Sequence, residues 1–390
     1  MTSPTLAATG HWTASGDLPA AATWYGQHDG AVRLQNGKVL TAGGADGGSA
    51  ALTRAALFDP AAGTWAATAA LSTARRLHTA TLLNDGRVLV AGGTGGSSPL
   101  SPGLATAEVY DPAGGSWESV ASMGEPRWGH SAVLLADNTV LVSGGTTTRS
   151  SDSVRALRTA EVYDPVADEW SAAEPMTDAR TGHATVRLTG GRVLACGGSA
   201  PISGRDETAL AFCELYDPGT GRWTPTGSLL AARSQHQALL ASGTTVLVVG
   251  GSTPGTPGDG TFDPFSTLTA ELFDLATGAW TALPEQPGGR GLHRAVALGS
   301  GKVLVIGGTG GGRDRAGYQS ALIFDTAART WSAAAGLTTG RWAFAATALA
   351  DGRVLVAGGA TGSGLAAADP AVDDLTRHTE IFSTSTGGPA

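Results

Sequence analysis

The sequence has little cysteine, little methionine and few charged side chains. Its 390 residues include 2 Cys and 3 Met, and charged residues make up only 15%. Two cysteines cannot supply the disulfide framework of a small secreted domain. Cys196 and Cys213 fall on neighbouring predicted strands, so the sequence leaves open whether they are buried thiols or a bridged pair. The formal net charge of -8 argues against nucleic acid and membrane surfaces as partners, because both attract basic proteins.

Long apolar runs are also absent. The start of the chain has neither the basic segment nor the apolar segment of a signal peptide. No run elsewhere is long enough to span a bilayer. We therefore expect a cytoplasmic protein.

Glycine, in contrast, is abundant, with 58 residues, and much of it is periodic. Seven Gly-Gly doublets each end an apolar run. Their first glycines lie 49 to 57 residues apart: Gly43, Gly92, Gly144, Gly197, Gly250, Gly307 and Gly358. A repeat of this length is typical of β-propellers, in which each repeat forms one four-stranded sheet.

Each repeat carries the same order of strand signals. In residues 130–170, SAVLL predicts strand A, VLVSGG strand B and TAEVYDP strand C, and Trp170 belongs to strand D. In six repeats a strand-C aromatic is followed seven residues later by Trp: Phe58/Trp65, Tyr110/Trp117, Tyr163/Trp170, Tyr216/Trp223, Phe273/Trp280 and Phe324/Trp331. These motifs resemble the kelch family over nearly the whole chain. The resemblance implies an all-β fold, a seven-bladed kelch-type β-propeller formed by residues 1–390, with the aromatics packed between blades.

The last repeat is incomplete at its C-terminal end. Phe382 lies in its strand C, but the sequence reaches Ala390 without the expected Trp. Residues 11–15 read as an isolated strand D, and Trp12 lies 53 residues before Trp65. We predict that this N-terminal strand completes the C-terminal blade and removes exposed sheet edges.

The strand order also predicts which face carries function. The D–A and B–C connections share one face, and the B–C connections vary in length from 14 to 23 residues. Variable loops on a rigid scaffold are the usual place for binding sites. We therefore expect the site on this face, at the mouth of the central channel.

An Arg-x-x-His motif precedes strand A in five repeats. Its histidines are His78, His130, His183, His236 and His293. Since strand A lines the channel, these imidazoles could form a ring that binds a metal or acts as a base. A position repeated in five blades is more typical of a scaffold hydrogen bond.

The arginines that precede strand A coincide with glutamates in strand C. Five blades have both, which predicts the buried pairs Arg75–Glu108, Arg127–Glu161, Arg180–Glu214, Arg233–Glu271 and Arg341–Glu380. The first blade lacks both, with Gly26 and Ala56 at the expected positions, and the sixth has Leu322 in place of Glu. We therefore expect Arg290, in the sixth blade, to be free for a ligand anion such as a carboxylate.

The sixth, seventh and first blades depart most from the repeat and would be neighbours around the ring. Their candidate catalytic residues are His28, Arg290 and His293. Their candidate ligand-binding residues are Trp24, Tyr25, Arg294, Trp342 and Phe344, to which the third blade adds Trp128. Aromatic side chains with few polar groups suit a small organic ligand. Local repacking where the ring closes would explain the same departures.

The longest B–C connection lies in the seventh blade and is acidic. It contains Asp373, Asp374 and His378, which could hold a divalent metal or perform acid–base chemistry. A solvated acidic loop has the same composition.

Stretches such as residues 82–93 are most similar to the propeller of galactose oxidase and its bacterial relatives. In that family an Arg-x-Tyr-His stretch supplies Tyr and His to copper. Here the residue before the motif histidine is Leu77, Gly129, Gly182, Gln235 or Leu292, and never Tyr. The family's C-terminal domain, which supplies a further His ligand, has no counterpart in these residues. The resemblance therefore implies the fold and argues against a copper-radical centre.

Three functions fit these observations. The first is a stand-alone propeller with a small-molecule site at the channel mouth, such as an enzyme of secondary metabolism. The second, implied by the resemblance to kelch adaptor proteins, is a protein-interaction module that holds an acidic peptide on the same face. The third is a metal-dependent enzyme that uses the histidine ring. We favour the first.

Overall fold

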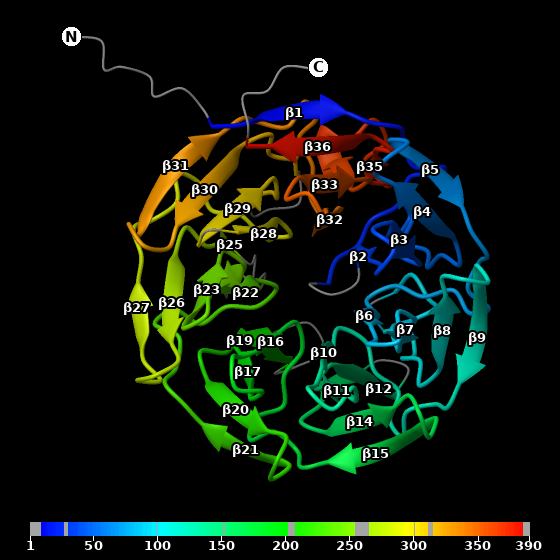
Figure 1. Cartoon of the computed structure of the whole chain (residues 1–390), viewed down its shortest axis with the longest axis vertical. Coiled ribbons are helices and arrows are strands. Elements are labelled where there is room, and N and C mark those ends of the chain that lie inside the picture. Colours follow the sequence, from blue (N-terminus) through cyan, green and yellow to red (C-terminus); the bar gives the residue numbers. More distant parts are fainter. Residues whose placement is uncertain are drawn as a thin grey trace.

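Seven four-stranded antiparallel sheets stand around a central axis as the blades of a propeller (Figure 1). The computed structural model describes residues 9–26, 30–98, 100–150, 153–201, 207–253, 265–299, 301–310 and 315–384. This arrangement confirms the predicted all-β, seven-bladed fold. The described part of the chain contains one helix, a 3-10 turn at Gly364–Ala366, and no helix that could cross a membrane.

The first six blades use four strands in chain order, from the axis to the rim. The first contains β2 (Val32–Arg33), β3 (Val39–Ala42), β4 (Ala55–Asp59) and β5 (Thr64–Ala67). The second contains β6 (Thr79–Leu82), β7 (Val88–Ala91), β8 (Ala107–Asp111) and β9 (Ser116–Val120). The third contains β10 (Ser131–Leu134), β11 (Val140–Ser143), β14 (Ala160–Asp164) and β15 (Glu169–Ala173).

The next three blades repeat this order. The fourth contains β16 (Ala184–Arg187), β17 (Val193–Cys196), β20 (Cys213–Asp217) and β21 (Arg222–Pro225). The fifth contains β22 (Gln237–Ser242), β23 (Thr245–Val249), β26 (Ala270–Asp274) and β27 (Trp280–Ala282). The sixth contains β28 (Arg294–Gly299), β29 (Lys302–Ile306), β30 (Ala321–Asp325) and β31 (Thr330–Ala334).

The two ends of the chain close the ring in the seventh blade. Its strands are β32 (Ala345–Ala348), β33 (Val354–Ala357), β36 (Thr379–Ser383) and β1 (His11–Ala14). Strand β1 pairs antiparallel with β36, with Trp12 opposite Phe382, and Figure 1 shows it as the outermost strand of this blade. The prediction that the N-terminal strand completes the last blade is therefore confirmed.

Four B–C connections carry small two-stranded ribbons. They pair β12 (Thr146–Ser150) with β13 (Ser153–Ala156), β18 (Ser199–Pro201) with β19 (Glu207–Ala209), β24 (Ser252–Thr253) with β25 (Phe265–Ser266), and β34 (Ala360–Gly362) with β35 (Asp374–Leu375). These ribbons extend the variable connections on one face of the disc.

Aromatic pairs and apolar strands hold neighbouring blades together. In all seven blades the strand-C aromatic ring and the strand-D Trp ring have centroids 4.9–5.2 Å apart. Tyr110 of the second blade, for example, packs in one cluster with Leu40 and Ala42 of the first. Burial of such rings contributes much of the core energy of a propeller, so the predicted role between blades is confirmed.

The Gly-Gly doublets end strand B at points where no side chain fits. At Gly92, φ is +63°, and a Cβ would lie 2.6 Å from both Arg127 O and His130 Cε1. Only glycine allows this close approach of the next blade at a positive φ.

Candidate functional site

The repeated Arg and Glu residues pair inside their blades, as the sequence predicts. In five blades an Arg Nη2 lies 2.6–3.1 Å from a Glu Oε1, and these side chains are 10% exposed or less: Arg75–Glu108, Arg127–Glu161, Arg180–Glu214, Arg233–Glu271 and Arg341–Glu380. Arg75 also donates to Gly92 O and Thr106 O, at 2.8 and 3.0 Å. These bonds tie the D–A connection to the end of strand B, which is a scaffold role.

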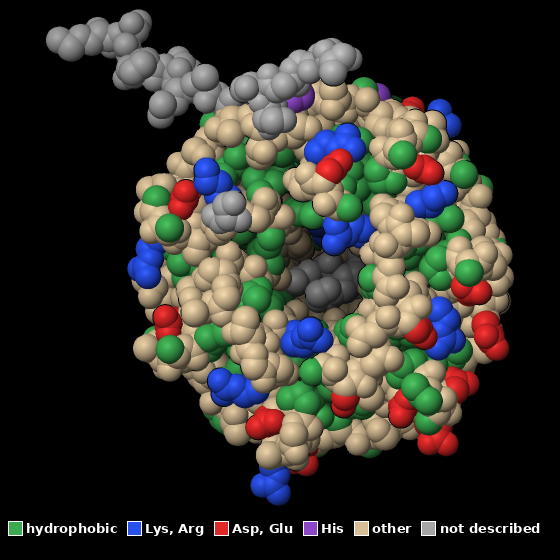
Figure 2. All heavy atoms as spheres, in the orientation of Figure 1, with side chains coloured by type: hydrophobic (Ala, Val, Ile, Leu, Met, Phe, Trp, Pro, Cys, Tyr) green, Lys and Arg blue, Asp and Glu red, His purple; other side chains and the backbone are tan. Residues whose placement is uncertain are grey.

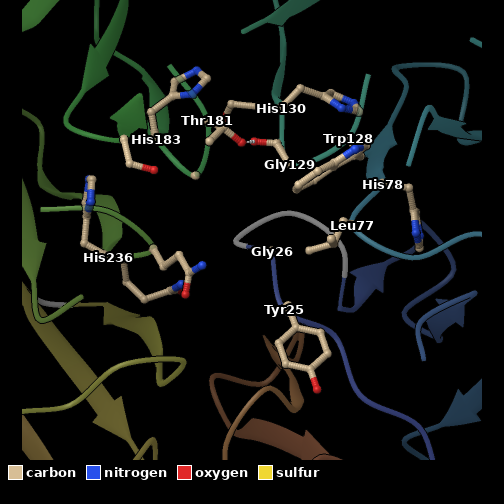
Figure 3. A pocket seen from close by; sticks show the side chains of 15 residues that line it. Tyr25, Gly26, Leu77, His78, Trp128, Gly129, His130, Thr181, His183 and His236 are labelled. Atoms are coloured by element: carbon tan, nitrogen blue, oxygen red, sulfur yellow. Dashed lines mark hydrogen bonds between the residues drawn. The ribbon is translucent and has the colours of Figure 1, made fainter. Parts of the chain in front are cut away.

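The five motif histidines lie in the walls between blades and do not surround one point. They are 0–7% exposed, and each ring packs against the first glycine of the preceding doublet. Figure 3 shows His78, His130, His183 and His236 on separate blades around the channel. Within the described ranges, no group of three His, Cys, Asp or Glu side chains could hold a metal ion. The structure therefore does not assemble the predicted histidine metal ring.

Burial keeps the imidazoles of His78, His236 and His293 neutral. Together with the nearby charges of Arg75 and Arg233, it lowers the pKa of His78 and of His236 to about 3. Burial holds the pKa of His293 well below its usual range. In the seventh blade Phe344 fills the equivalent place against Gly307, which shows that the position requires a flat ring and not a base.

The residue before each of these rings has a left-handed backbone. Its φ is between 48° and 62° at Leu77, Gly129, Gly182, Gln235, Leu292 and Ala343. Neighbouring blades are joined here by backbone bonds, such as Gly129 N to Leu77 O at 2.9 Å and Gln235 N to Gly182 O at 2.8 Å. This conformation is costly for side chains other than glycine and is frequent at functional sites.

Two adjoining cavities open at the channel inside this ring, and Figure 3 shows the first of them. The first has a volume of about 90 Å³ and is lined by residues that include Tyr25, Leu77, Trp128, Thr181 and Gln235. The second has a volume of about 220 Å³, shares Tyr25 and Gln235, and adds Ser252, Ser266, Thr309 and Arg315. Figure 2 shows that one face of the disc is hollowed at its centre, with Lys and Arg side chains close to the opening.

Trp128 lines the first cavity with its ring. Its indole Nε1 is shielded from solvent and has no hydrogen-bond partner within the described part of the chain. The strand-D tryptophans differ, because their indoles donate to atoms of the preceding blade, as Trp170 does to Ala121 O at 2.8 Å. Trp128 therefore contributes apolar surface to the cavity, because its shielded N–H does not face a ligand there.

Tyr25 and Asp373 form a polar pair beside the channel. The Tyr25 hydroxyl donates to Asp373 Oδ2 at 3.4 Å. Burial, and then the charge of Asp373, raises the pKa of Tyr25. Burial also raises the pKa of the Asp373 carboxyl, against the opposing effects of Tyr25 and Arg315. The pair can present both a hydroxyl and a carboxylate to a ligand in the channel.

The other predicted ligand-binding residues are part of the scaffold. Trp24, Trp342 and Phe344 are only 0–3% exposed. Arg294 donates to Phe344 O at 2.8 Å and to Trp24 O at 2.6 Å, which links the sixth, seventh and first blades. Repacking at the ring closure accounts for these four residues, and they do not line the channel cavities.

Arg290 is enclosed in the sixth blade. It is 2% exposed and donates to Gly307 O and to Ser320 O and Oγ at 3.1–3.2 Å. Within the described ranges no carboxylate forms an ion pair with it, as Leu322 at the Glu position predicts. Burial lowers its pKa to about 10. The structure thus leaves this cation without a carboxylate, but away from the channel that a ligand would enter.

The first blade lacks the ion pair, but its register differs from the prediction. Ala22, and not Gly26, occupies the Arg position, because Ala22 O accepts the Gly359 N–H at 2.9 Å as Arg127 O accepts that of Gly93. Trp24 then fills the place of the motif ring, against Gly358, and Tyr25 is left to face the channel. The predicted Arg position, Gly26, was wrong by four residues, and the candidate catalytic residue His28 lies outside the described residues.

The acidic residues of the seventh blade do not converge. Asp373 accepts from Tyr25, Asp374 accepts the Ala368 N–H at 2.8 Å, and the His378 Nδ1 atom lies 3.1 Å from Asp17. Each therefore has a separate partner, and the structure does not form the predicted metal-binding loop from them.

The two cysteines are free thiols in the fourth blade. Cys196 and Cys213 face each other on β17 and β20 and are both buried. Of the two interpretations left open by the sequence, the structure shows the unbridged one.

Sequence reasoning missed Gln235 and Thr181 as channel-lining residues. The available signal was the position itself, since Gln235 directly precedes a motif histidine and Thr181 lies two residues before another. That part of the motif lines the channel cavities in the second to sixth blades.

Comparisons with known proteins agree with this fold. The model of the kelch motif family matches residues 75–124 and 127–177. Kelch-like protein 25 of Xenopus tropicalis is 30% identical over 230 residues, which are 57% of this chain and 35% of that protein. Kelch-like protein 36 of Rattus norvegicus is 26% identical over 281 residues, 71% of this chain and 42% of that protein. The chain therefore spans less than half the length of these curated relatives.

A solved structure is similar over most of the chain. It is described as a novel fungal alcohol oxidase of the AA5 family in complex with copper. The TM-score is 0.73 with 21% sequence identity, over 96% of this chain and 76% of that one. The likeness shows a shared propeller fold.

Proposed function

We propose, from the premise that the chain is a kelch-repeat β-propeller, that it binds a small organic molecule rich in acceptor oxygens at the mouth of its channel. The observation that carries this proposal is the pair of adjoining cavities, in which the rings of Tyr25 and Trp128 lie near the polar side chains of Gln235 and Arg315. A ligand oxygen in these cavities would accept from the amide or the guanidinium.

The other groups around the two cavities support the same ligand chemistry. Gln235, Arg315 and the hydroxyl of Ser252 supply the donors. The faces of Tyr25 and Trp128 supply flat apolar surface for a ring or a planar carbonyl group. The volumes of about 90 and 220 Å³ together approach the lower end of small-ligand sites, about 300 Å³. We therefore expect a compact ligand, such as an aromatic or heterocyclic acid or amide.

A fragment screen by ligand-observed NMR tests this proposal. The library should contain small aromatic carboxylates and carboxamides, with aromatic amines of the same size as the comparison set. The acids and amides should bind preferentially, because the lining offers mainly donors. Preferential binding of the amines would contradict the proposed chemistry.

Two variants assign the binding to the channel. Gln235→Leu keeps the size of the side chain and removes the amide donor that lines both cavities, so the affinity of hits should fall about 5- to 10-fold, as expected for one hydrogen bond. Val166→Ser is the matched control, because Val166 is 90% exposed in a C–D turn, and it should leave affinity unchanged. Hits that bind Gln235→Leu as tightly as the wild-type protein would refute the assignment.

A further inference from the structure

The ion pairs of five blades occupy a slot of common construction. In the second blade the slot is formed by Gly92 O and Thr106 O, which accept from Arg75, and by Glu108. The N–H of Ser72, three residues before the arginine, donates to Glu108 at 2.7 Å. Equivalent N–H bonds to the glutamates come from Gly124, Thr177, Leu230 and Thr338 in the other four blades. The slot is thus built to hold a guanidinium on its aliphatic stem.

The first blade has the same slot but lacks the Arg and Glu side chains that fill it in five other blades. The Arg position is Ala22, the Glu position is Ala56, and the N–H donor is replaced by Pro19, which has no N–H. A cavity of about 160 Å³ lies at this place, with both alanines, Pro19, Leu18 and Gly43 in its wall. None of its lining residues lines the channel cavities. The volume that the side chains fill elsewhere is open here.

The carbonyl groups that would receive a guanidinium are still in position. Gly43 N donates to Arg54 O at 2.9 Å, as Gly92 N donates to Thr106 O at 3.1 Å in the second blade. Gly43 O, the counterpart of Gly92 O, accepts no hydrogen bond within the described residues. Arg54 O has a second lone pair for another donor. The two residues that carry these acceptors therefore line a slot whose other lining residues are apolar except for Thr41 and Thr68.

The sixth blade shows that such a slot holds a guanidinium without a carboxylate. Arg290 is buried there, and among the described residues it donates to Gly307 O and to the Ser320 carbonyl and hydroxyl. Leu322 stands at the Glu position, and Pro287 stands where the N–H donor would be. The first and sixth blades thus both lack the glutamate and the N–H donor. They differ because the sixth blade has an arginine of its own in the slot and the first blade does not.

We propose that the first-blade slot binds a guanidinium group on a short alkyl stem, supplied from outside the chain. The planar cation donates to Gly43 O and Arg54 O, as Arg290 does to the equivalent carbonyls. The stem lies against Leu18, Pro19 and the two alanines, where other blades place the methylene groups of their own arginine. The formal net charge of -8 favours a cationic ligand over an anionic one.

Titration calorimetry with butylguanidinium chloride tests this proposal on the intact chain. A ligand of this size should bind with a dissociation constant of the order of 1 mM. Pentanol, which has a similar stem and no cation, should bind at least 5-fold more weakly. Equal affinity for pentanol would overturn the proposal in favour of a purely apolar cavity.

Variants of Ala22 locate the site. Ala22→Arg rebuilds the arrangement of the sixth blade and should abolish binding of butylguanidinium while raising the melting temperature. Ala22→Met fills the stem region without a cation and should abolish binding as well. Unchanged binding in the folded forms of these variants would place the ligand elsewhere and overturn the proposal.

Chemical rescue in the sixth blade gives an independent readout. Arg290→Ala empties a second slot of the same build, so butylguanidinium should raise the melting temperature of this variant more than that of the wild-type protein. Replacing butylguanidinium by N-acetyl-arginine amide tests whether the guanidinium group comes from an arginine side chain of a peptide or from a free small molecule. Absence of any rescue would show that a detached guanidinium does not occupy such slots, against the proposal.

Discussion

Replacing His236 by phenylalanine should make the protein less sensitive to acid. His236 is buried between the fourth and fifth blades, and burial together with Arg233 lowers its pKa to about 3. In the unfolded chain its pKa is the ordinary value of about 6.5. Between these two pKa values the unfolded state binds a proton that the folded state does not, so the free energy of unfolding falls as the pH falls through this window.

The size of the effect follows from the two pKa values. On going from pH 7.5 to pH 5.0, one histidine of this kind lowers the free energy of unfolding by about 2 kcal/mol. Phenylalanine does not titrate, and Phe344 fills the equivalent place in the seventh blade, so the ring fits. The Cys196 contact of His236, at 3.6 Å, is lost at both pH values and cancels from the difference.

Urea denaturation at pH 7.5 and pH 5.0 measures this difference. The pH-dependent loss should be about 2 kcal/mol smaller in His236→Phe than in the wild-type protein. The reciprocal variant Phe344→His should lose about 2 kcal/mol more than the wild-type protein. Parallel pH profiles for the three proteins would refute the inference that the interblade imidazoles are held neutral.

Three further outcomes follow from the scaffold. Glu214→Gln leaves Arg180 buried without a carboxylate, so it should lower the free energy of unfolding, measured by urea denaturation, by about 3–5 kcal/mol. Replacing both residues by Leu should recover a large part of this loss. A loss below about 1 kcal/mol in Glu214→Gln would contradict a buried pair. Trp12→Ala removes the indole ring 5.1 Å from the Phe382 ring and its hydrogen bond to Ala335 O at 2.7 Å. The free energy of unfolding should therefore fall by about 3 kcal/mol in the same assay. A negligible loss would mean that β1 does not close the propeller. Cys196 and Cys213 are buried, and burial raises the pKa of both thiols. A thiol reagent should therefore modify them only as fast as the chain unfolds. Modification of the native protein within seconds would disagree with this burial.

The fold could be predicted from sequence because every repeat contains the same packing and turn residues. The Gly-Gly doublet, the strand-C aromatic and the strand-D Trp recur at fixed spacing, so seven blades and the closing strand around Trp12 could be counted. The Arg–Glu pairs could be predicted from co-occurrence, because a buried guanidinium needs a carboxylate and five blades have both.

The site was harder to predict because it depends on the direction in which each side chain points as well as on its position in the repeat. Unusual aromatics such as Trp342 and Phe344 read as ligand contacts, but they face the blade walls and are buried there. The first blade is reached through an irregular connection, so the Arg position was predicted at Gly26, four residues beyond its observed place at Ala22. Trp128 and Tyr25 were identified for their ring type, but only the structure shows that they lie on the channel.

A crystal structure of the protein soaked with the tightest fragment from the screen would examine the channel directly. A ligand oxygen should lie about 3 Å from Gln235 Nε2 or from the Arg315 guanidinium, with the ligand ring beside Tyr25 and Trp128. A fragment bound outside these two cavities would contradict the proposed site.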